Sequence, residues 1–106
     1  MVYNDFAGDI VHLWSNGGGN WFFDMPVQAT SGIAARVNVA TGMSAFAWAA
    51  DATEHIVYVG QDGHIYELTV KQGSAMSNLG LPWTATDITA LVESDPRYSP
   101  PVMAQE

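Results

Sequence analysis

Tryptophans and carboxylates are the side chains of this 106-residue chain whose types favour chemistry. Trp14, Trp21 and Trp83 offer flat apolar rings, and Glu67 and His12 offer polar groups at neighbouring positions. A carbohydrate site needs an aromatic plate for the sugar ring and a polar acceptor for its hydroxyls. We therefore name these five residues as candidate ligand-binding residues. The competing reading places the tryptophans in the core, where large aromatic side chains are most often found.

Histidines and acids also raise the question of a metal site or an active site. His12, His55 and His64 have no i, i+2 or i, i+4 spacing, so no metal site is predicted. Four acids could supply the carboxylate pair of a glycosidase, but nothing in the sequence fixes their separation. They are Asp9, Asp24, Glu67 and Asp87. We interpret Asp24 and Asp87 instead as caps at strand ends. We predict no catalytic residue and no cofactor, and keep a small carboxylate enzyme as a third reading.

The charge of the chain limits its partners. There are 11 acidic residues against 3 Lys plus Arg, which gives a formal net charge of −8. Binding to nucleic acid or to an anionic membrane surface requires clustered basic residues, so neither partner is predicted. No apolar run reaches the length of a membrane span. The absence of cysteine excludes disulfides and leaves the cellular compartment open.

The stretch Glu54–Leu68 organises the chain because it predicts a β-hairpin. Two runs rich in β-branched and aromatic residues flank a turn that ends in Asp62-Gly63, a strong hairpin signal. A weaker copy occurs near the N-terminus, where Tyr3 aligns with Tyr58 at an offset of 55 residues (58 − 3). The same offset aligns Gly8 with Gly63, Ile10 with Ile65 and Leu13 with Leu68. An internal repeat of this size predicts a repeat architecture.

The repeat predicts an all-β fold with four strands in each unit. Residues 1–42 form an incomplete first unit and a connection, residues 43–96 a second unit, and residues 97–106 a strand that completes a neighbouring or the first unit. We expect Met43–Ala49 to be a buried strand with Phe46 and Trp48 on one face. A short helical turn is expected around Ile33–Val37. The remaining predicted strands are Met1–Asn4, Asp9–Trp14, Asn20–Met25, the two hairpin arms, Pro82–Thr89 and the terminal run Val102–Ala104.

Four-stranded meanders repeated about an axis are the blades of β-propellers. The runs His55–Tyr58, Asp62–Leu68 and Asp87–Ala90, with Trp83 between the last two, resemble the repeats of bacterial and fungal lectin-like propellers. The resemblance implies carbohydrate binding, with Glu67 at the position of a sugar-binding glutamate. The first copy has His12 at this position, and Ile56 stands where fucose-binding repeats carry an arginine.

Two blades do not enclose a ring, because propellers have about 4 to 8 blades. The chain is therefore predicted to assemble with copies of itself, three chains giving six blades, and deletion of residues 102–106 should then disturb assembly. The alternative fold is an ordinary monomeric β-sandwich or α+β domain whose two hairpins are alike by chance. The alternative function is a structural or protein-interaction scaffold with no sugar site.

Overall fold

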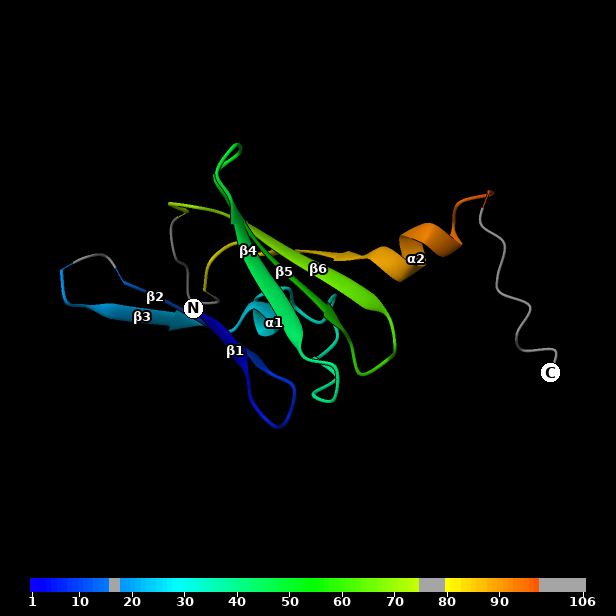
Figure 1. The fold of residues 1–106 in the computed structure, drawn as a ribbon, viewed down its shortest axis with the longest axis horizontal. Coiled ribbons are helices and arrows are strands. Elements are labelled where there is room, and N and C mark those ends of the chain that lie inside the picture. Colours follow the sequence, from blue (N-terminus) through cyan, green and yellow to red (C-terminus); the bar gives the residue numbers. More distant parts are fainter. Residues whose placement is uncertain (16–17, 75–79, 98–106) are drawn as a thin grey trace.

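The computed structural model describes residues 1–15, 18–74 and 80–97 and consists mostly of strands in two antiparallel sheets. Figure 1 shows the three-stranded sheet beside the four-stranded sheet, with two short helices. This arrangement confirms the all-β class. Two sheets do not by themselves close a propeller. Within the described residues, no helix is both long and apolar enough to cross a membrane.

The first sheet has the order β1-β2-β3 and contains β1 (Val2–Asn4), β2 (Ile10–Ser15) and β3 (Trp21–Asp24). The turn between β1 and β2 is closed by Asp5, whose Oδ1 accepts hydrogen bonds from two backbone N–H groups that follow it. Gly8 in this turn has a φ of +88°, and a Cβ atom there would lie 2.4 Å from a backbone carbonyl oxygen. Glycine is therefore required at this position.

The second sheet has the order β4-β5-β6-β7. It contains β4 (Met43–Trp48), β5 (Thr53–Val59), β6 (Ile65–Lys71) and β7 (Thr84–Asp87). The predicted hairpin is β5 and β6, and Gly63 in its turn has a φ of +83°. Both sheets are meanders of sequential strands, as the repeat predicted.

The backbone pairing of the two sheets repeats the sequence alignment. Tyr3 pairs with Val11 in the first sheet, and their equivalents at an offset of 55, Tyr58 and Tyr66, pair in the second. The third strands of the two repeats, β3 and β7, align at a larger offset of 62 residues (86 − 24). His12 pairs with Asp24, and the equivalent residues Glu67 and Thr86 also pair. Strands β1, β2 and β3 therefore correspond to β5, β6 and β7, and among the described residues β4 has no counterpart in the first sheet.

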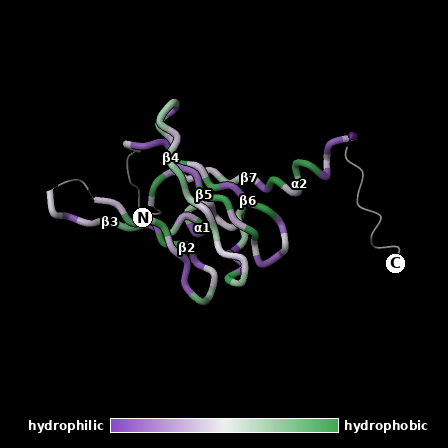
Figure 2. The backbone as a smooth tube through the Cα atoms, in the orientation of Figure 1, coloured by the Kyte–Doolittle hydropathy of each residue, from purple (hydrophilic) through white to green (hydrophobic). Residues whose placement is uncertain are grey.

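Each sheet is followed directly by a short helix. The first, α1 (Pro26–Ala29), begins with proline, whose fixed φ suits the first helical position. The second, α2 (Ile88–Glu93), is capped by Asp87, which accepts a hydrogen bond of 2.9 Å from the Ala90 N–H. Figure 2 shows that α2 carries hydrophobic residues, although none of its residues is buried.

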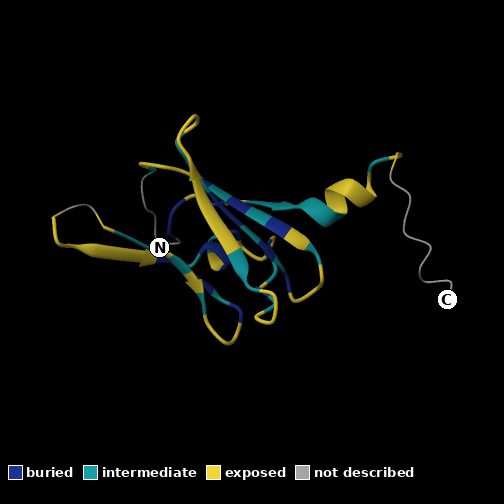
Figure 3. Cartoon of the chain, in the orientation of Figure 1, coloured by how far each residue is buried: buried dark blue, intermediate teal, exposed yellow. Residues whose placement is uncertain are grey.

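The core lies where the two sheets face each other. It is formed by one face of each sheet together with α1 and the long connection from β3 to β4. Figure 3 shows the buried positions on β5 and β6 and the exposed character of β3 and β4. The buried apolar residues are Ile10, Val27, Ala34, Val37, Ile56, Tyr58, Tyr66, Leu68, Val70, Leu81 and Trp83. Because strand side chains alternate, each sheet has an inner face in this core and an outer face away from it.

Three expectations need correction. Strand β4 was predicted to be buried, but Phe46 and Trp48 share its outer face and are both exposed, because β4 is an edge strand with no second sheet against that face. The expected helical turn at Ile33–Val37 is wrong, since the helix in this connection is α1. The predicted strand Pro82–Thr89 is shorter, because Asp87 caps a helix there. The terminal run Val102–Ala104 lies outside the described residues.

Candidate functional site

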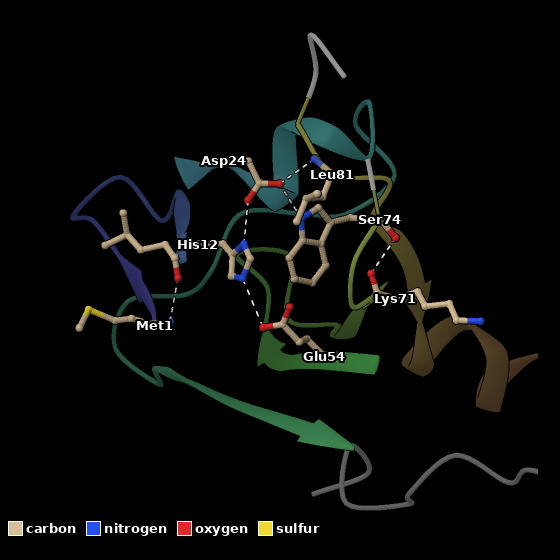
Figure 4. A network of polar contacts seen from close by, with 9 residues as sticks. Met1, His12, Asp24, Glu54, Lys71, Ser74 and Leu81 are labelled. Atoms are coloured by element: carbon tan, nitrogen blue, oxygen red, sulfur yellow. Dashed lines mark hydrogen bonds and ion pairs between the residues drawn. The ribbon is translucent and has the colours of Figure 1, made fainter. Parts of the chain in front are cut away.

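His12 occupies the centre of a polar network between the two sheets (Figure 4). It projects from the inner face of β2 and is only 1% exposed. Its Nδ1 lies 3.0 Å from Asp24 Oδ1 in the same sheet, and its Nε2 lies 3.4 Å from Glu54 Oε1 on β5. Both ring nitrogens thus face carboxylate oxygens, one from each sheet, and His12 links the two sheets through polar contacts.

Asp24 has all its hydrogen bonds inside the protein. Its Oδ2 accepts the Leu81 backbone N–H at 2.9 Å and the Trp83 indole N–H at 2.8 Å, while Oδ1 faces His12. The carboxylate therefore fixes the ring of His12 and the ring of Trp83 at once. The sequence reading of Asp24 as a strand-end cap is wrong, because its side chain is buried and bonds to residues of the second unit. Asp87, given the same reading, is the cap of α2.

Aromatic rings enclose His12. Trp14 stacks on it with ring centroids 4.9 Å apart and an interplanar angle of 24°. Trp83 meets it edge-on at 5.2 Å and 84°. Phe22 in turn stacks on Trp14 at 5.8 Å. Three of the five predicted ligand-binding residues, His12, Trp14 and Trp83, are thus in one cluster.

A cavity of about 310 Å³ opens beside this cluster. Its walls include Trp83, Ala45 on the inner face of β4, and the N-terminal residue Met1 beside β1. Glu54 also lines it, and the carboxylate that His12 contacts is about one-third exposed. An aromatic wall and a positioned carboxylate can hold a neutral ligand that has an apolar face and hydroxyl groups.

The other two predicted residues lie on the outer faces, and neither of them lines this cavity. Glu67 Oε2 is 3.1 Å from His55 Nδ1 on the outer face of the second sheet. Trp21 is on the outer face of the first sheet and is 66% exposed. The structure therefore separates Glu67 and Trp21 from the cluster around His12.

His55 belongs to a chain of polar contacts on the outer face of the second sheet. Its Nε2 is 2.7 Å from the Thr53 hydroxyl, which donates to Asp51. Phe46 stacks on the imidazole at 4.8 Å with an interplanar angle of 9°. Because the single hydroxyl hydrogen of Thr53 is given to Asp51, Thr53 is not positioned as a nucleophile activated by His55.

A further polar cluster surrounds the tip of the β5–β6 hairpin. His64 Nδ1 is 2.8 Å from Asp87 Oδ2, and this hydrogen bond raises the pKa of His64, with Asp62 and Glu93 adding to the effect. The Tyr66 hydroxyl donates to Asp62 at 2.7 Å, which raises the pKa of Tyr66. Within the described part of the chain, no group of three or more His, Asp or Glu side chains is arranged to hold a metal ion.

Sequence reasoning missed Glu54 as a site residue. It directly precedes His55 in β5, so the alternation of strand side chains puts the two polar groups on opposite faces of the sheet. Two adjacent ionisable residues in a strand rich in apolar residues were the available signal. The partner of Glu54 lies 42 residues away in the other sheet, which no local pattern shows.

Comparison with known proteins identifies no relative. No known protein family matches the chain, and neither the curated proteins nor the solved structures contain a significant match.

Proposed function

We propose that this protein is a non-catalytic ligand-binding protein, with carbohydrate as the ligand class, and that its chain is a two-blade subunit of a ring. The observation that carries the ligand-binding part is the cavity lined by Trp83 and by Glu54, whose carboxylate is about one-third exposed. A sugar packs its apolar ring face on an aromatic wall and donates its hydroxyls to a carboxylate. Contact with His12 holds Glu54 in place.

The size of the cavity and the charge of the chain support a small neutral ligand. A volume of about 310 Å³ is at the lower end of the range of small-molecule sites, about 300 to 1,000 Å³, and suits one or two sugar units. The net charge of −8 disfavours phosphorylated and other anionic ligands. The resemblance of the repeats to those of lectin-like propellers agrees with this ligand class.

The ring part of the proposal is supported by the incomplete sheets. In the part of the chain that the structure describes, the first sheet has no counterpart of β4, so β1 is an edge strand. Two four-stranded units are too few for a propeller, whereas three chains supply six. Assembly of identical chains by one repeated contact closes a ring when the rotation permits it.

The experiment is a calorimetric titration of the full chain with a panel of neutral monosaccharides and disaccharides, comparing wild type with Glu54→Gln. Loss of a hydrogen bond to a charged group costs about 1.5 to 3 kcal/mol, so we expect at least tenfold weaker binding. Glu93→Gln on α2 is the matched control, because it removes the same charge away from the cavity and should bind as wild type does. Failure of every sugar to bind, or equal binding by Glu54→Gln, contradicts the carbohydrate proposal.

A scaffold without a sugar site is the second candidate, and the exposed aromatic side chains of both outer faces favour it. Phe23, Phe46 and Trp48 are each more than half exposed. Patches of this kind mark protein-interaction surfaces. A protein that assembles in solution but gives no heat with any sugar of the panel is the result that this candidate predicts.

A further inference from the structure

The outer face of the first sheet consists of apolar side chains. Backbone pairing puts Tyr3 opposite Val11, and Leu13 opposite Phe23, so these side chains share one face. Trp21 lies on this face also, two residues before Phe23. We call these five residues the first outer face. Trp21 is 66% and Phe23 60% exposed, and none of the five is charged.

The outer face of the second sheet combines apolar side chains with one histidine–glutamate contact. Phe46 pairs with His55, and Val57 pairs with Glu67, so these four share a face. Ile65 and Trp48 extend it along β6 and β4 and are 42% and 56% exposed. The second outer face is defined as Phe46, Trp48, His55, Val57, Ile65 and Glu67.

We call the packing between the inner faces of the two sheets of one chain the joint. The joint shows which kinds of face fit together. The first sheet contributes Ile10 and His12 to this joint, and their equivalents at an offset of 55 are Ile65 and Glu67. Those equivalents lie on the second outer face. Equivalent positions of the two repeats therefore lie on the inner face of the first sheet and on the outer face of the second sheet.

The reverse holds for the other side of the joint. The second sheet contributes Tyr58, Tyr66, Leu68 and Trp83, all buried. Their equivalents are members of the first outer face: Tyr3, Val11, Leu13 and Trp21. Each exposed face is thus equivalent to one of the two faces that pack together in the joint. The first outer face is equivalent to the inner face of the second sheet, and the second outer face is equivalent to the inner face of the first sheet.

We propose that the first outer face of one copy of this chain packs on the second outer face of the next copy, repeating the joint between its own two sheets. This inference rests on the proposed ring and specifies its contact. Trp21 of one copy then lies against Glu67 and His55 of the next, as Trp83 lies against His12 within the chain. The partner copy therefore supplies the cover that Trp21 lacks.

The chemistry of the faces favours this head-to-tail contact over a two-fold contact between like faces. Joining two second outer faces would place two Glu67–His55 pairs together under apolar rings, which carries a desolvation cost. Joining two first outer faces would leave Phe46, Trp48 and Ile65 exposed on both copies. Head-to-tail packing covers both faces of every chain once the ring closes.

The test uses two double variants at exposed positions of the full-length protein. Trp21→Glu with Phe23→Glu alters the first outer face, and Trp48→Glu with Ile65→Glu alters the second. None of these residues lines the cavity proposed for sugar. Leu91→Glu on α2, at a position 63% exposed outside both faces, is the control. Circular dichroism establishes that each variant is folded, and sedimentation velocity gives the mass of each alone and of equal mixtures.

We expect wild type and Leu91→Glu to sediment as the ring, and each double variant alone to sediment as an 11.4 kDa monomer. An equal mixture of the two double variants should form dimers and no larger species, because each retains the face that the other lacks. A folded double variant that keeps the wild-type mass overturns the inference while leaving the ring intact. A wild type that is monomeric throughout overturns both the inference and the ring, and leaves the sugar proposal to its own titration.

Discussion

Trp21 and Trp83 stand at equivalent positions of the two sheets, yet Trp21 is 66% exposed and Trp83 is 6% exposed. The strands themselves do not explain the difference, because the three residues after each tryptophan pair in the same register, with Trp21 in β3 and Trp83 directly before β7. Trp83 is buried because the first sheet lies against it and Asp24 accepts its indole N–H. No sheet of the described residues packs on the face that carries Trp21. The comparison shows that burial in this protein is determined by the neighbouring sheet and not by the local sequence.

The polar positions differ between the sheets in the same way. Asp24 is at the centre of the joint and bonds to three groups, whereas its equivalent Thr86 lies on the outer face and is partly exposed. His12 and its equivalent Glu67 show the same contrast. The two sheets share one backbone plan, and the joint between them requires a specific set of polar residues on one side.

The largest expected effect is that of Asp24→Ala. Its removal leaves the Leu81 N–H, the Trp83 indole N–H and the His12 ring without their acceptor in a buried site, which costs about 3 to 5 kcal/mol. The equivalent Thr86→Ala should change the free energy of unfolding by no more than about 0.5 kcal/mol. Urea denaturation of both variants measures the difference. Similar losses of unfolding free energy for Asp24→Ala and Thr86→Ala would contradict the special position of Asp24.

Leu68→Ala and Leu13→Ala test the apolar side of the comparison. Leu68 is fully buried, and truncation should cost about 2 to 4 kcal/mol through lost transfer energy and a cavity. The equivalent Leu13 is only half-buried, so in dilute protein Leu13→Ala should cost less than about half as much. If Leu13 is covered by a second copy, the destabilisation caused by Leu13→Ala should grow with protein concentration. Thermal unfolding at two concentrations checks this, and a larger loss for Leu13→Ala in dilute protein would refute the comparison.

The smallest expected effect is a pH dependence that arises from His64 in the second sheet. The hydrogen bond to Asp87 raises the pKa of His64 above its ordinary value of 6.5, so the folded protein binds this proton more tightly than the unfolded chain does. The stabilisation is complete below pH 6.5 and is lost as the pH rises through the raised pKa. The melting temperature should therefore fall slightly over this range.

Asp87→Asn is the variant that isolates this effect. Asparagine keeps a good cap for α2 but removes the carboxylate that faces His64, so the pH dependence should become flatter. Asp95→Asn removes a carboxylate that faces Arg97 and should leave the pH profile unchanged. An unchanged profile in Asp87→Asn would assign the pH dependence to another group.

The sequence predicted the strand order because its signals are local. The Asp62-Gly63 turn, the alternating runs beside it and the repeat at Tyr3 and Tyr58 specified both meanders and their pairing. The prediction for β4 failed because apolar composition does not distinguish a strand that is covered on its faces from an exposed edge strand. The helix α2 was missed because Asp87 was read as a strand end.

The candidate site could be predicted only in part. The tryptophans and His12 drew attention by residue type, and His12, Trp14 and Trp83 do meet. Their meeting depends on how two sheets face each other, which the pattern within each sheet does not contain. Glu54 and Asp24 owe their roles to contacts between distant parts of the chain, so residue type and spacing gave no warning of them.

The measurement that tests the account most directly is the solution mass of the full-length protein by sedimentation velocity over a range of concentrations. Repetition of the joint between copies predicts one species of three times the 11.4 kDa chain mass. A single 11.4 kDa species at every concentration would show that the exposed faces of the two sheets do not join, and would contradict the account.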